Sequence, residues 1–124
     1  MRSLVHLALI LLILTPMSLN ARQKVGGGTF APFWLQFKSA VARNDKEAVA
    51  SMTKLPLMFE NKERSRAEFI KIYDLLFVRE VRKCFANGKP VKDGDTYELF
   101  CGQQIFYFGR VDGEYKFLEF GVND

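Results

Sequence analysis

The sequence predicts an α+β domain in which a curved antiparallel sheet wraps around N-terminal helices. In the first half of the chain, apolar residues recur at intervals of three and four, which is the period of amphipathic helices. Three consecutive runs between Thr96 and Val122 have the aromatic-rich composition of strands, and Asp112-Gly113 marks a tight turn between the last two. Helices followed by adjacent strands indicate one α+β domain, and the natural twist of the sheet curves it around the helices.

The chain begins with the layout of a secretory signal peptide, which we assign to residues 1–21. Arg2 gives a positive start, the apolar run Leu4 to Leu14 follows, and Ala21 supplies a small residue at a suitable cleavage point. The run is too short to span a bilayer comfortably, although an uncleaved N-terminal anchor is the alternative. We therefore expect a periplasmic or secreted protein, cleaved near Ala21, that meets the membrane only during export.

The mature chain is expected to start with a flexible segment, residues 22–29, that contains three consecutive glycines. The domain, residues 30–124, then opens with an amphipathic helix over residues 30–41. Asp45 is expected to cap a short second helix that runs to Met52. The apolar face of the first helix is formed by Phe30, Phe33, Trp34, Phe37, Ala40 and Val41.

The middle of the chain is expected to contain one strand, one loop and one long helix. The strand covers residues 55–59 and lies at a sheet edge or begins at Pro56, because proline has no backbone N–H to donate. Residues 60–64 have the charged composition of a loop. Ser65 begins a capping box, and the helix that follows, continuous or kinked, ends at Asn87-Gly88.

The last part of the chain is expected to be a turn-rich connector, residues 89–95, a strand, residues 96–101, and a hairpin, residues 103–122. With a two-residue turn at Asp112-Gly113, three cross-strand pairs share one face of the hairpin. They are Arg110 with Tyr115, Phe108 with Phe117, and Phe106 with Glu119. The opposite face is also apolar and consists of Ile105, Tyr107, Leu118, Phe120 and Val122. Each face therefore needs cover from helices, a ligand or a second chain.

The two cysteines, Cys84 and Cys101, are expected to form a disulfide, because export takes them to an oxidising compartment. The bridge would close a loop of about 18 residues and stabilise the folded state by about 3 kcal/mol on the chain-entropy model. The alternative is that both cysteines are buried free thiols. The only histidine, His6, lies in the signal peptide. The mature chain therefore lacks a Ser-His-Asp triad and a His-ligated metal site, and we expect no metal and no cofactor.

The charge balance is mildly basic, with a formal net charge of +4 for the whole chain. Positive and negative residues are interspersed, as in Lys62-Glu63-Arg64 and Arg79-Glu80-Val81-Arg82. This pattern is typical of solvated faces and differs from the basic stripe of a nucleic-acid-binding protein, so we expect no nucleic-acid partner.

Several segments of the mature chain resemble one family of small exported domains. These segments are Phe33 to Ala50, Leu55 to Leu57, Ser65 to Phe69 with Tyr73-Asp74, and Phe108 to Phe120. Together they cover most of the mature chain and are similar to the pattern of nuclear transport factor 2-like domains. The resemblance implies a cone, in which a curved sheet wraps around helices and leaves a cavity at the open end. Relatives of that fold include ketosteroid isomerase, transport adaptors and immunity proteins, so the fold alone does not assign a function.

The high aromatic content favours a binding function. The chain contains 12 Phe, 4 Tyr and one Trp, all in the expected mature part. We therefore expect a non-catalytic binding domain that holds a small apolar ligand or an envelope protein through an aromatic cavity or through the sheet face. The candidate ligand-binding residues, for each of which core packing is the alternative role, are Phe33, Trp34, Phe37, Tyr73, Phe106, Phe108, Tyr115, Phe117 and Glu119. The open sheet face is also a candidate surface for a homodimer.

Two other functions stay open. An inhibitor or immunity-type protein of the cell envelope would block a toxin or hydrolase by inserting an exposed loop, such as residues 60–64 or 89–95. A ketosteroid-isomerase-like enzyme would use Glu119 as a buried carboxylate, with Tyr115 or Tyr73 as the hydrogen-bond donor, because an apolar site raises the pKa of a carboxyl group. An ion pair or contact with water is the alternative role of Glu119, and the lack of histidine in the mature chain argues against an enzyme.

Overall fold

A computed structural model describes residues 29–123 of the chain, which form four helices and six strands. The expected signal peptide, and all of the expected flexible N-terminus except Thr29, lie outside the described residues. In chain order the elements are α1 (Phe30–Ala42), α2 (Lys46–Ser51), β1 (Leu57–Phe59), β2 (Lys62–Arg64), α3 (Arg66–Leu76), α4 (Arg79–Asn87), β3 (Val91–Asp93), β4 (Thr96–Cys101), β5 (Gln104–Val111) and β6 (Glu114–Val122).

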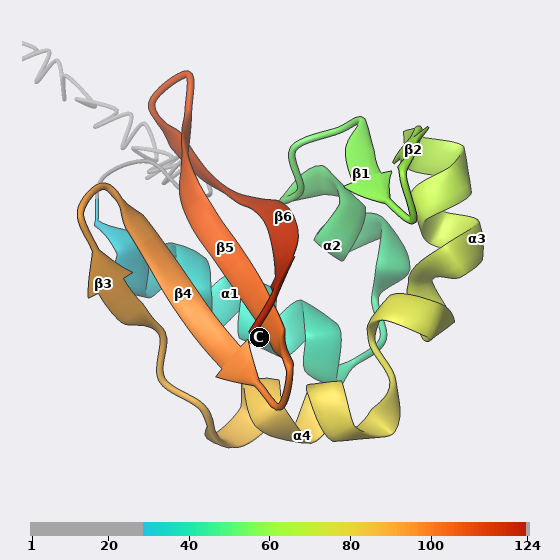
Figure 1. Cartoon of the computed structure of the whole chain (residues 1–124). Coiled ribbons are helices and arrows are strands. Elements are labelled where there is room, and N and C mark those ends of the chain that lie inside the picture. The colour runs from blue at the N-terminus through green and yellow to red at the C-terminus, as the bar shows by residue number, and fades with distance from the viewer. Residues whose placement is uncertain (1–28, 124) are drawn as a thin grey trace, which may run out of the picture.

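The predicted α+β class is confirmed. An antiparallel sheet in the order β3-β4-β5-β6 lies in front of helix α1, and helix α4 crosses below the sheet (Figure 1). Helix α2, the β1–β2 hairpin and helix α3 stand to one side of the sheet, next to β6 (Figure 1). The sheet therefore has one face covered by helix and one face that no described element covers.

Both predicted N-terminal helices are confirmed. Helix α1 packs its aromatic stripe against the sheet, and the Phe30 ring stacks on Tyr97 of β4 with the ring centroids 3.8 Å apart. Asn44, with a positive φ of 51°, turns the chain after α1. The Asp45 carboxylate then accepts a hydrogen bond from the Ala48 amide, which caps α2 as predicted.

Residues 60–64, which we expected to be a loop, instead contain β2. The strand expected over residues 55–59 is also shorter than predicted, because Leu55-Pro56 stay outside β1. Glu60 and Asn61 both have positive φ, 51° and 58°, which is the backbone conformation of a two-residue hairpin turn. Glutamate rarely adopts this conformation, so the sequence carried no hairpin signal here.

The long helix of the middle segment is two helices, α3 and α4, separated at Phe77 and Val78. Ser65 caps α3 as predicted, since its hydroxyl accepts a hydrogen bond from the Glu68 amide at 3.3 Å. The expected connector over residues 89–95 also differs from the prediction, because it contains β3, which pairs antiparallel with β4. The strand predicted over residues 96–101 and the final hairpin are confirmed.

The predicted hairpin register is correct near the turn and wrong beyond it. The pairs that agree with the prediction are Arg110–Tyr115 and Phe108–Phe117. A bulge between Tyr107 and Phe108 then shifts the pairing, so that Phe106 lies opposite Phe120 and not opposite Glu119. The shift turns Phe120 towards the core, where its ring centroid lies 5.0 Å from that of Phe106, and leaves Glu119 exposed. Burying a phenyl ring is favourable and burying an unpaired carboxylate is not, so the bulge is the better solution.

Aromatic rings fill the space between the helices and the sheet. The Phe85 ring of α4 meets the Phe106 ring of β5 edge to face, with the centroids 4.9 Å apart. Each fully buried phenyl side chain stabilises the fold by about 1.5–3 kcal/mol. The phenylalanines with no exposed surface are Phe33, Phe37, Phe69, Phe77, Phe85, Phe106, Phe108 and Phe117.

Two links fasten the helical part of the chain to the sheet. The predicted disulfide joins Cys84 of α4 to Cys101 of β4. On the other side, the Phe117 amide donates to the Met52 carbonyl, and the Lys54 amide donates to the Phe117 carbonyl, each at 2.8 Å. The second link ties the end of α2 directly to β6.

Candidate functional site

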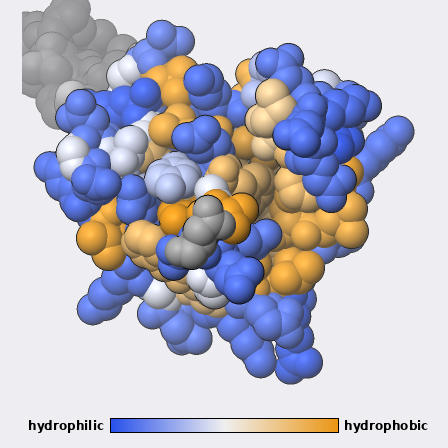
Figure 2. Space-filling model, viewed as in Figure 1, coloured by the Kyte–Doolittle hydropathy of each residue, from blue (hydrophilic) through white to orange (hydrophobic). Residues whose placement is uncertain are grey.

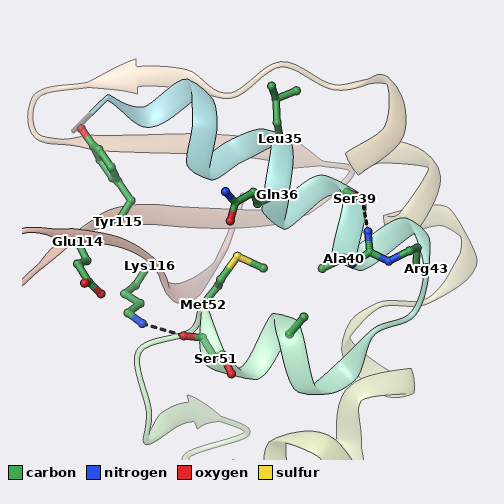
Figure 3. A pocket seen from close by; sticks show the side chains of 11 residues that line it. Leu35, Gln36, Ser39, Ala40, Arg43, Ser51, Met52, Glu114, Tyr115 and Lys116 are labelled. Atoms are coloured by element: carbon green, nitrogen blue, oxygen red, sulfur yellow. Dashed lines mark hydrogen bonds between the residues drawn. The ribbon is translucent and has the colours of Figure 1, made fainter. Parts of the chain in front are cut away.

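A groove lies between α1, α2 and the beginning of β6 (Figure 3), and we call it the α1–α2 groove. Its volume is about 660 Å³. The residues that line it are Leu35, Gln36, Ser39, Ala40 and Arg43 of α1 and its end, Ala48, Ser51 and Met52 of α2 and its end, and Glu114, Tyr115 and Lys116 of β6.

The floor of the groove is apolar. Ala40, Met52 and Tyr115 are almost completely buried, and Figure 3 shows the Met52 side chain reaching towards α1. Leu35 extends the apolar surface along α1, and 65% of this residue is exposed. A buried methionine beside a tyrosine ring offers contact to an apolar molecule.

The groove exists because small residues occupy the facing sides of the two helices. Gln36, Ser39, Ala40 and Arg43 follow one another at helical spacing, so they lie along one side of α1, next to the aromatic stripe that enters the core. Ala48 faces them from α2. Serine and alanine side chains leave the space between the helices open.

Two cations and one carboxylate stand at the rim. The Arg43 guanidinium donates to the Ser39 hydroxyl and lies 3.6 Å from the Asp45 carboxylate, so its charge is paired within the chain. The Lys116 ammonium donates to the Ser51 carbonyl at 2.7 Å (Figure 3). Glu114 is the one carboxylate that lines the groove.

The lining combines an apolar floor with few ionisable groups, which is the usual composition of a small-molecule binding site. Its ionisable side chains are Arg43, Glu114, Tyr115 and Lys116, and the lining contains no histidine or cysteine. Within residues 29–123 there is no group of three or more His, Cys, Asp or Glu side chains that could hold a metal ion.

The predicted ligand-binding residues are mostly core residues in the structure. Tyr115 alone among them lines the α1–α2 groove. Trp34 is half-buried, and its ring centroid lies 5.5 Å from that of Phe85. Those with no exposed surface are Phe33, Phe37, Tyr73, Phe106, Phe108 and Phe117. Because these six rings pack against one another and against neighbouring side chains, the core-packing role is the one that the structure displays.

The expected catalytic arrangement is not assembled. Glu119 is exposed and lies opposite Tyr107, away from the core face that holds Tyr115 and Tyr73. The shifted register is the physical reason, since it exchanges Glu119 for Phe120 on the inner face. The hydroxyl of Tyr73 is buried without a hydrogen-bond partner among the described residues, and burial raises its pKa to about 12.

The uncovered face of the sheet carries exposed apolar residues. Phe100 is 47% exposed, and Tyr107 and Leu118 on the neighbouring strands are half-buried. Figure 2, which looks onto this face, shows hydrophobic areas separated by hydrophilic side chains. Burial raises the pKa of Glu98, on this sheet, above its ordinary value.

The sequence does not predict most of the residues that line the groove. Its residues come from three parts of the chain, and the set mixes small, polar and charged side chains without a recurring spacing.

Comparison of the chain with protein-family models, with curated proteins and with solved structures finds no match. Among the described residues, no helix combines the length and the apolar composition that crossing a membrane requires.

Proposed function

We propose that this chain is an exported, non-catalytic binding domain that holds a small ligand with an apolar body in the α1–α2 groove. The observation that carries the proposal is the groove itself. Its volume of about 660 Å³ falls within the range of roughly 300–1,000 Å³ that is usual for small-molecule sites. An apolar floor with a few polar groups at the rim is the usual composition of such sites.

The core argues for the groove as the site in preference to an aromatic cavity. Phe37, Phe108 and Phe117 have no exposed surface, and their rings contact one another with centroid distances between 5.3 and 6.0 Å. Entry of a ligand between them would require the core to open. The groove needs no such rearrangement.

We further propose that the fold is the cone of nuclear transport factor 2-like domains. The order of the elements supports this proposal, because helices and a short hairpin precede a four-stranded antiparallel sheet that packs on α1. In this chain the inside of the cone would be filled by phenylalanine side chains, and binding would take place beside α1. Export of the chain rests on the signal-peptide pattern, and the mass of the secreted protein would test cleavage near Ala21.

The binding proposal is tested by titrating the protein with decanol, a neutral probe with an apolar chain, while recording amide NMR spectra. We expect the largest shifts at residues of α1, α2 and the start of β6. Gln36→Trp, which places an indole in the groove, should abolish them. Ala31→Trp is the matched control, because Ala31 is an exposed residue of the same helix that does not line the groove. Shifts that persist in Gln36→Trp, or that map elsewhere, would contradict the proposal.

A protein partner on the uncovered sheet face is the second candidate, favoured by the exposed Phe100 with Tyr107 and Leu118 beside it. Such a partner would be an envelope protein, as for an inhibitor or immunity factor, or a second copy of this chain. The mass of the protein in solution at rising concentration tests the homodimer. The variant Phe100→Ser should keep the mass at that of one chain.

A further inference from the structure

The α1–α2 groove has one cation whose charge is not paired within the described part of the chain. The Lys116 ammonium has three N–H donors, and one of them is used by the Ser51 carbonyl at 2.7 Å. Among residues 29–123, no carboxylate forms an ion pair with Lys116, whereas Arg43 has Asp45 at 3.6 Å. The hydrogen bond to Ser51 holds the ammonium at the rim and leaves two donors for another group.

The Lys116 ammonium lies at the edge of the apolar floor of the groove. The Lys116 ammonium is bonded to the carbonyl of Ser51, which directly precedes Met52, and Lys116 and Met52 both line the groove. The ammonium therefore lies at the edge of the surface formed by Met52, Tyr115 and Ala40 (Figure 3). A molecule lying on that floor would bring one end to the Lys116 ammonium.

We propose that the ligand of the α1–α2 groove is an amphipathic anion, an aliphatic carboxylate whose chain lies along the floor and whose carboxylate accepts hydrogen bonds from the Lys116 ammonium. The inference rests on the proposed function and adds the chemical class of the ligand. A charge-assisted hydrogen bond is shorter and stronger than a neutral one, so Lys116 favours this head group over a hydroxyl. The rim is open to water, which limits the preference to about two- to fivefold.

Glu114 is the group at the rim that opposes this assignment. Its carboxylate stands two residues from Lys116 in β6 and repels an anion, so it would favour a ligand with a positive head group. Arg43 is already paired with Asp45, so the preference for an anion rests on Lys116, which a backbone carbonyl holds in place. Glu114 weakens this preference, and its replacement gives a test of opposite sign.

The experiment measures the affinity of three probes of equal chain length by calorimetry at neutral pH: decanoate, decanol and decylammonium. The purified disulfide-bonded protein should bind decanoate about two- to fivefold more tightly than decanol, and decylammonium least. Lys116→Met should remove the difference between decanoate and decanol. Glu114→Gln should increase the affinity for decanoate, and Lys116→Arg should preserve the preference, which separates charge from a loss of folding.

The outcomes distinguish the ligand class from the binding function. Equal binding of decanoate and decanol, tightest binding of decylammonium, or unchanged decanoate affinity in Lys116→Met would overturn the anionic class and leave the groove as a binding site. Failure of all three probes to bind would overturn both proposals. Near-ultraviolet circular dichroism of each variant checks that the aromatic core is intact.

Discussion

Replacing Tyr73 by phenylalanine should stabilise the protein. The side chain of Tyr73 has no exposed surface, and its hydroxyl has no hydrogen-bond partner among the described residues. Its ring stacks on Phe77 with the centroids 4.6 Å apart, a contact that phenylalanine retains. A buried polar group without a partner costs about 1–3 kcal/mol, so the variant should gain a similar amount. For a domain of this size, each kcal/mol raises Tm by roughly 4–8 °C.

Urea unfolding of the wild type and of Tyr73→Phe at neutral pH measures this gain, with an unchanged m value as the sign that only stability has changed. Burial raises the pKa of Tyr73 from its ordinary value of 10.0 to about 12. A raised pKa in the folded state means that the unfolded tyrosine ionises first, so the wild type loses stability as the pH rises from about 10 to about 12. Tyr73→Phe lacks this loss, and its advantage should widen over that window.

Tyr107→Phe is the control, because Tyr107 is half-buried on the uncovered face of the sheet. Its stability should stay within about 0.5 kcal/mol of the wild type. The reasoning is refuted if Tyr73→Phe is less stable than the wild type at neutral pH, since the hydroxyl would then have a partner. Parallel stability curves for the two proteins above pH 10 would contradict the pKa argument separately.

Three further changes test other parts of the fold. Replacing Cys84 and Cys101 together by serine should lower the free energy of unfolding by about 3 kcal/mol relative to the disulfide-bonded wild type. Denaturant unfolding measures this loss, and the reduced wild type, as the control, should lose a similar amount. Gly88→Ala should destabilise the protein by about 1–3 kcal/mol, because the added Cβ would lie 2.6 Å from the Cys84 carbonyl oxygen; an unchanged Tm would show that α4 can shift. Glu68→Gln should lower Tm at pH 7 and not at pH 3. The hydrogen bond from the Lys62 ammonium holds the pKa of Glu68 below its ordinary value, so its stabilising effect is present above about pH 4.5 and is lost as the pH falls. A Tm difference that is equal at both pH values would contradict this account.

The sequence predicted those elements whose signal is local. The aromatic stripe of α1, the caps at Asp45 and Ser65 and the turn at Asp112-Gly113 each depend on residues within a few positions of one another. The β1–β2 hairpin was not predicted because its turn residues, Glu60 and Asn61, have positive φ. Glycine is the residue that usually indicates this conformation in a sequence, and there is none in this turn. Its strands are three residues each, too short for a period of two to be recognised.

The candidate site was harder to predict than the fold for a physical reason. The shifted pairing of β5 with β6 depends on the gain from packing Phe120 against Phe106 and Phe117, which are contacts that only the folded sheet creates. If the pairing is not shifted, the alternation of side chains along the strand places Glu119 on the core face. The α1–α2 groove lies where the small side chains of Ser39 and Ala48 leave space between the helices. A space of this kind depends on how the helices pack, so no sequence pattern predicts it.

The link between the end of α2 and β6 sets the order in which the protein can form. Lys116 and Ser51, which it brings together, are 65 residues apart in the chain. Phe33 and Phe37 leave the ribosome early, but the rings that cover them, Phe108 and Phe117, are among the last to be synthesised. Because the apolar side of α1 is buried only by the final hairpin, the chain stays unfolded until synthesis is nearly complete. Contacts between residues so far apart in the chain also slow folding.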